Sequence, residues 1–174
     1  MRFFIITKRH LTVALSLILG FAVIAVGAFS YQSFAASNKK VPIYCVDDKG
    51  AKKVALSFDA AWGNEDTEKI LDILKENDVK VTFFMTGEWV EKYPEDVKKI
   101  AKDGHALGNH SENHKKMSEI SVDECKEEIM VVHNKVKELT GVEMEVFRPP
   151  YGDYDDKLVD VIYEVGYYPI QWSI

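Results

Sequence analysis

A carboxylate, Asp59, stands directly after a short apolar run from Val54 to Phe58, and a Trp-Gly pair follows at residues 62–63. A short apolar run bounded by turn signals predicts a buried strand. Open α/β sheets and (β/α) barrels carry their catalytic groups at the carboxyl ends of the strands. Asp59 is therefore a candidate for acid–base chemistry. Taken alone, the stretch fits a carboxylate that caps the following loop or helix equally well.

Two further stretches carry reactive side chains. His110 and His114 lie four residues apart. On a helical turn this spacing puts both imidazole rings on one face, as in the H-E-x-x-H zinc motif, although the pair by itself fits histidines of a solvated loop better. The stretch Arg148-Pro-Pro-Tyr151-Gly152 predicts a rigid loop with a charged donor and a phenol. By itself it is typical of a proline-rich turn with a surface arginine.

Strand-like and helix-like segments alternate from residue 53 onward. β-branched and aromatic runs predict strands at 54–58, 79–85, 106–109, 146–148 and 167–173. Apolar residues at helical spacing predict helices over 66–76, 94–102, 121–140 and 155–164. This alternation predicts an α/β fold with a parallel sheet. Asp59, His110 and Arg148 then share one rim, because all three follow the carboxyl ends of strands.

The N-terminal part differs from the rest. Residues 1–10 form a basic N-terminus, and residues 11–30 are uncharged and largely apolar. This run is long enough to cross a bilayer as a helix, and it exceeds the usual apolar core of a cleaved signal peptide. The basic flank predicts that the N-terminus is cytoplasmic and that the domain is exported. We therefore expect a single-pass membrane protein, or a secreted one if the segment is cleaved. Residues 31–52 are a predicted linker, with a short edge strand possible at 41–46.

Charge also divides the chain. Residues 1–40 hold five basic and no acidic residues, and the net charge of −6 leaves −11 on residues 41–174. Phosphate contacts need a basic face, so we expect no nucleic-acid partner. The cysteines, Cys45 and Cys125, lie far apart and have no C-x-x-C spacing. We expect two free thiols rather than a disulfide framework. Nothing in the sequence predicts an oligomeric state.

The motifs Ser57-Phe-Asp59, His110-x-x-x-His114 and Arg148-Pro-Pro-Tyr151-Gly152, in this order, resemble those of the NodB-homology polysaccharide deacetylases, carbohydrate esterase family four. The resemblance covers the predicted domain, residues 53–174. Together with the apolar N-terminal segment, it looks most like the membrane-anchored, sporulation-associated branch. It implies a (β/α) barrel of the polysaccharide deacetylase type. It also implies a hydrolase that removes N-acetyl groups from the amino sugars of a cell-wall glycan, acting on carbon–nitrogen but not peptide bonds.

The same resemblance implies a role for each motif residue. Asp59 would be the general base, and Arg148 would hold it through a charge-assisted hydrogen bond. Tyr151 would offer its backbone N–H to the developing oxyanion. His110 and His114 would bind a divalent metal, zinc in most members of the family.

Two departures from the family pattern limit this expectation. Ala60 stands where the family commonly has a second aspartate that binds the metal, so we expect metal affinity to be weakened. The family also has further motifs after the position of Ile174, so we expect a C-terminally truncated, incomplete barrel with low activity. The alternative is an inactive, membrane-anchored glycan-binding or signalling remnant.

Overall fold

The computed structural model describes residues 8–37, 39–47, 49–50 and 52–173. The chain divides into two units, residues 1–39 and 40–174. In the first unit the structure describes the helix α1 (Lys8–Ser37), which covers the predicted transmembrane segment. Within the described residues, however, no helix combines the length and the hydropathy needed to cross a membrane.

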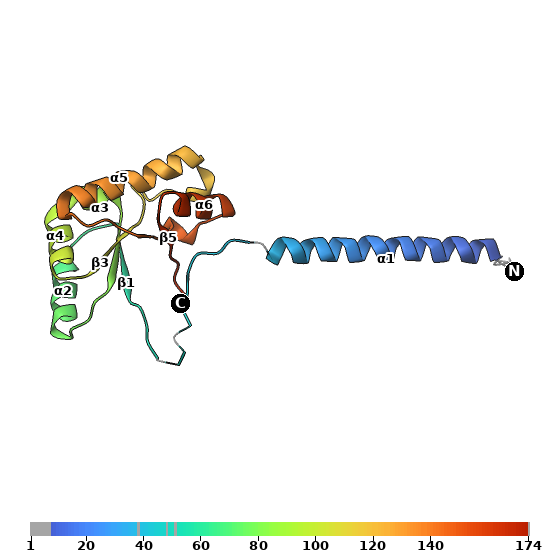
Figure 1. Ribbon diagram of the computed structural model, residues 1–174, viewed down its shortest axis with the longest axis horizontal. Coiled ribbons are helices and arrows are strands. Elements are labelled where there is room, and N and C mark those ends of the chain that lie inside the picture. Colours follow the sequence, from blue (N-terminus) through green and yellow to red (C-terminus); the bar gives the residue numbers. More distant parts are fainter. Residues whose placement is uncertain (1–7, 38, 48, 51, 174) are drawn as a thin grey trace. The chain divides into compact units, whose positions relative to one another are not determined.

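The second unit is built on a parallel five-stranded sheet whose strands follow one another in chain order. They are β1 (Ser57–Ala60), β2 (Thr82–Met85), β3 (Ala106–Asn109), β4 (Val146–Phe147) and β5 (Tyr168–Pro169). Because parallel crossovers are almost always right-handed, strands in chain order keep their connecting helices on one face of the sheet. In Figure 1 the helices α2, α3, α4 and α5 lie along the outer side of the strands. The predicted α/β class and parallel sheet are confirmed.

The helices of this unit are α2 (Thr67–Glu76), α3 (Gly87–Lys92), α4 (Pro94–Lys102), α5 (Val122–Thr140) and α6 (Asp156–Glu164). Short 3-10 turns cover Met117–Glu119 and Pro150–Gly152. The predicted start of α5 is observed, since the Ser121 hydroxyl accepts a hydrogen bond from the Glu124 backbone N–H. Its predicted end is observed as well, because Gly141 takes the left-handed conformation at a φ of 75°.

The core lies between the sheet and its helices. Strand side chains on one face meet the apolar stripes of α2, α4, α5 and α6, and burial of this surface is the main stabilising term of the fold. Its most buried members, with less than 2% of their surface exposed, include Leu71, Met85, Val97, Ile100, Met117, Ile129, Phe147, Leu158 and Ile162.

Several predicted boundaries are wrong. β1 begins at Ser57 rather than Val54, because its pairing with β2 starts there. The first hydrogen bond between the two strands runs from the Thr82 N–H to the Leu56 carbonyl. The predicted strand at 167–173 shortens to the two residues of β5. The short edge strand expected at 41–46 is reduced to one parallel bridge between Ile43 and Ile170. Both cysteines are free, as expected.

Candidate active site

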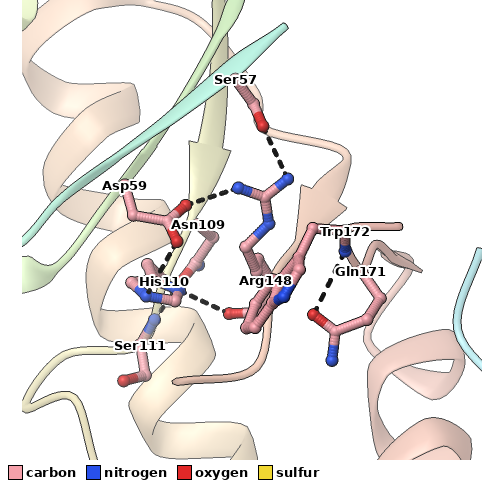
Figure 2. Close-up of polar contacts among 8 residues, drawn as sticks. All are labelled: Ser57, Asp59, Asn109, His110, Ser111, Arg148, Gln171 and Trp172. Carbon is pink, nitrogen blue, oxygen red and sulfur yellow. Dashed lines mark hydrogen bonds and ion pairs between the residues drawn. The ribbon is translucent and has the colours of Figure 1, made fainter. Parts of the chain in front are cut away.

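Asp59 and Arg148 form the central ion pair of the site, at the carboxyl end of the sheet (Figure 2). Nη1 of Arg148 lies 2.6 Å from Oδ1 of Asp59, and Nη2 donates to the Ser57 hydroxyl at 2.8 Å. Successive strand residues point to opposite faces, so Ser57 and Asp59 share one face of β1. The guanidinium group therefore bridges two side chains of one strand, and this fixes the direction in which the Asp59 carboxylate points.

Arg148 is buried, with 5% of its surface exposed, and an aromatic ring supports it. Its guanidinium carbon lies 3.9 Å from the centroid of the Phe84 ring. A cation over an aromatic face at this distance is a favourable cation–π contact. Phe84 in turn lies against Gly108, where a Cβ would come within 2.5 Å of Cδ1 of the ring. The absence of a side chain at residue 108 makes room for the ring that carries Arg148.

His110 follows β3 and lies beside this ion pair. Its Nδ1 is 2.7 Å from the Arg148 carbonyl oxygen. A carbonyl can only accept a hydrogen bond, so Nδ1 carries the proton and Nε2 keeps its lone pair in the neutral ring. Nε2 is directed into the site, 3.9 Å from Oδ2 of Asp59. Burial lowers the pKa of His110, against the opposing effect of the Asp59 carboxylate, and so favours this neutral form.

His114 lies next to His110, with 4.9 Å between the ring centroids. The pair lies in a loop and not on a helical turn, because Ser111 and His114 both have left-handed backbone conformations, with φ values of 64° and 52°. Such conformations are strained for residues other than glycine, and they cluster at functional sites. Burial lowers the pKa of His114 as well.

Two buried side chains hold the histidine loop, residues 110–115. Asn109 accepts a hydrogen bond from the Ser111 N–H at 3.0 Å and donates to the Ile129 carbonyl at 2.8 Å. Glu128 of α5 accepts from the backbone N–H and the side-chain amide of Asn113, at 2.8 and 2.7 Å. These bonds tie the left-handed turns to β3 on one side and to α5 on the other.

Tyr151 completes the set of predicted site residues. Its backbone is left-handed, at a φ of 60° and a ψ of 6°, inside the turn that follows β4. Its ring lies 4.5 Å from the His114 ring, centroid to centroid, and is largely exposed. The structure thus places Asp59, His110, His114, Arg148 and Tyr151 at one end of the sheet. Sequence reasoning missed Ser57 as a partner of Arg148, although its position two residues before Asp59 was a usable signal.

The side chains present do not complete a metal site of three protein ligands. His110 and His114 can offer two imidazole nitrogens, but Ala60 brings no ligand atom. Over the described part of the chain, no cluster of three or more His, Cys, Asp or Glu side chains is arranged to hold a metal ion. Zinc sites are almost always built on at least three protein ligands. This donor set therefore falls one carboxylate short.

Known proteins share sequence and fold with this chain. Residues 47–170 match the family described as polysaccharide deacetylase. A 30.6 kDa protein of Geobacillus stearothermophilus is 42% identical over 136 residues, which are 78% of this chain and 51% of that protein. The peptidoglycan-N-acetylglucosamine deacetylase of Bacillus cereus is 38% identical over 122 residues, 70% of this chain and 44% of the enzyme. The chain spans about half the length, or less, of these relatives.

Among solved structures, a CE4 family pseudoenzyme from Bacillus anthracis aligns with a TM-score of 0.74 and 34% identity, over 77% of this chain and 47% of that one. A mutant of the same protein, described as having restored enzymatic activity, aligns with the same TM-score and 35% identity, over 77% of this chain and 49% of that one. The fold is therefore shared with known proteins, among them a pseudoenzyme.

Proposed function

The chain belongs to the polysaccharide deacetylase family, and from this membership we propose that its domain acts on N-acetylated amino sugars of a cell-wall glycan. The reaction would be hydrolysis of the amide carbon–nitrogen bond, giving acetate and a free amine. The name of the B. cereus relative supports the choice of a peptidoglycan-like substrate. The strand order supports a further proposal, that the five strands are part of a (β/α) barrel.

The observation that carries the proposal is the Asp59 carboxylate held by Arg148 beside the buried His110. In the proposed reaction, Asp59 takes a proton from the attacking water while the water oxygen bonds to the acetyl carbon. Arg148 keeps the carboxylate oriented and does not itself transfer a proton. The Tyr151 backbone N–H stabilises the charge that develops on the acetyl oxygen. The amide carbon–nitrogen bond then breaks, and the departing nitrogen takes up the proton that Asp59 received from the water.

Members of this family are metal-dependent in general, and we propose that His110 and His114 bind zinc weakly in this chain. Two imidazole ligands without the third carboxylate support only low affinity. This same deficit supports a second candidate function, an inactive glycan-binding or signalling protein that has kept the fold. Ala60 is the residue that favours it, together with the similarity to a pseudoenzyme.

We further propose that the domain works outside the cytoplasm. The basic residues before the apolar segment 11–30 support export, either with that segment retained as an anchor or after its removal. Accessibility of a C-terminal tag to protease in intact cells would test this. Protection of the tag until the cells are lysed would contradict it.

Release of acetate from N-acetylglucosamine oligomers tests the proposed reaction. With zinc supplied, we expect low activity from the natural chain, higher activity from Ala60→Asp, and none above background from Ala60→Asp combined with Asp59→Asn. Equal acetate release with and without Asp59 would contradict its role as the base. Glycan binding without acetate release by either Asp59-containing chain would favour the second candidate.

A further inference from the structure

Trp62 is the most exposed aromatic side chain in the described part of residues 40–173, with 79% of its surface accessible. It follows β1 three residues after Asp59. Solitary exposed apolar side chains are common and need no explanation. Trp62 differs from them because of how its backbone is held and where its ring lies.

The loop that carries Trp62 is held by hydrogen bonds to α3 and α4. The buried Trp89 donates its indole N–H to the Gly63 carbonyl at 2.7 Å. The Asn64 side chain donates to a carboxylate oxygen of Asp96 at 2.7 Å, and the Asn64 carbonyl accepts from the Thr67 N–H. The two residues after Trp62 are therefore anchored to α3 and α4 while the Trp62 ring stays in solvent. A binding group presented on a fixed backbone loses little conformational freedom when a ligand binds.

The Trp62 ring is also the end of a row of rings that leads to the catalytic carboxylate. Its centroid lies 5.2 Å from that of His114, and the His114 ring lies 4.5 Å from that of Tyr151. His114 in turn neighbours His110, whose Nε2 faces Asp59. Both outer rings of the row, Trp62 and Tyr151, are exposed.

From this arrangement we infer that Trp62 forms a saccharide-stacking subsite, which binds the sugar next to the one whose acetyl group lies at Asp59. A pyranose ring has a face of C–H groups, and the negative face of an indole attracts such hydrogens while the sugar hydroxyls stay in water. An uncharged ring platform suits a neutral N-acetylated glycan better than a phosphorylated ligand. The inference rests on the proposed function for the identity of the ligand, but not on catalysis.

Binding of N-acetylglucosamine tetramer to the full chain tests this inference. Titration in the presence of a chelator, on the Asp59→Asn background, excludes both metal and turnover. We expect Trp62→Ala to weaken the Kd by at least about fivefold, and Trp62→Phe to weaken it by less, because a ring remains. Tyr163→Ala is the matched control, since Tyr163 is an exposed aromatic of α6 that contacts Tyr168 rather than the site, and it should bind like the parent chain.

Two results of this titration would overturn the inference. One is a Kd for Trp62→Ala equal to that of the Tyr163→Ala control, and the other is no binding of the tetramer by the parent chain. Sedimentation of the same variants shows whether a second copy of the chain, rather than a sugar, covers the Trp62 ring. Loss of a dimer in Trp62→Ala with unchanged tetramer binding would also contradict the inference. Because no acetate release is measured, failure of the proposed reaction leaves this result interpretable. Conversely, acetate release by Ala60→Asp with unaltered tetramer binding by Trp62→Ala would defeat the subsite alone.

Discussion

Arg148 connects the parts of the site at the scale of single residues. Its guanidinium group bonds Ser57 and Asp59 of β1 and stacks on Phe84 of β2, and its backbone carbonyl orients His110 after β3. One residue thus fixes both the Asp59 carboxylate and the His110 tautomer. The sequence predicted the pairing with Asp59 through the family resemblance, but not the three other contacts, because they depend on strand register.

Replacement of Arg148 by lysine should be strongly destabilising for a conservative change. An ammonium group cannot bond Ser57 and Asp59 as a planar fork or stack in the same way on Phe84. We expect the free energy of unfolding to fall by about 1–3 kcal/mol, as for the loss of buried hydrogen-bond partners, in urea denaturation followed by circular dichroism. Arg9→Lys, an exposed arginine of α1, is the control and should leave the transition unchanged. A transition for Arg148→Lys that matches the control would refute the buried clamp.

At the scale of elements, the histidine loop is supported by β3 and α5. The ends of α5 were predictable, because Ser121 and Gly141 act locally through capping and a left-handed turn. The conformation of the histidine loop was not predictable. It depends on the contact between Asn113 and Glu128, which lie 15 residues apart in the sequence, with a 3-10 turn and the start of α5 between them. α3 was missed for a related reason: six residues with a Thr86 cap are too few to show a helical period.

Glu128 should make the stability of the domain depend on acid pH. Burial acts to raise the pKa of this carboxyl, but hydrogen bonds from Asn113 and the Lys115 ammonium outweigh it, and the net pKa is lowered. A carboxyl with a depressed folded-state pKa contributes stability above its ordinary pKa and loses that stability as the pH falls through the folded value. Urea midpoints of the natural chain should therefore drop more steeply below about pH 4.5 than those of Glu128→Gln. Parallel pH profiles of the two chains would show that the Glu128 carboxylate does not hold the loop.

Gly108 should be intolerant of a methyl group, because β3 and β2 place it directly opposite Phe84. A Cβ at residue 108 would come within 2.5 Å of the Phe84 ring, which is buried and supports Arg148. Overpacking of this kind costs about 1–3 kcal/mol. Calorimetric melting of Gly108→Ala is the measurement. Gly27→Ala in α1, where a Cβ meets nothing within 4 Å, is the control, and an equally small effect of both changes would argue against the Phe84 support.

At the scale of the whole molecule, the site is a product of sheet topology. Parallel strands in chain order bring Asp59 and Arg148 together across 89 positions of sequence. This convergence followed from the alternating pattern alone, because the carboxyl ends of parallel strands share one edge. The left-handed turns at Ser111 and His114 and the exposed ring of Trp62 did not follow from it. They are set by loop contacts that no periodicity encodes.

Zinc binding is the most direct test of the central claim, that this is a deacetylase-family site one carboxylate short of a metal centre. Isothermal titration of the natural chain, Ala60→Asp and Ala60→Asn gives stoichiometry and affinity, and the asparagine variant matches the aspartate in size without its charge. We expect Ala60→Asp to bind one zinc ion per chain at least about tenfold more tightly than the other two. His110→Ala added to Ala60→Asp should abolish the gain. Equal affinity of the aspartate and asparagine variants, or no zinc uptake by any of these chains, would contradict the claim.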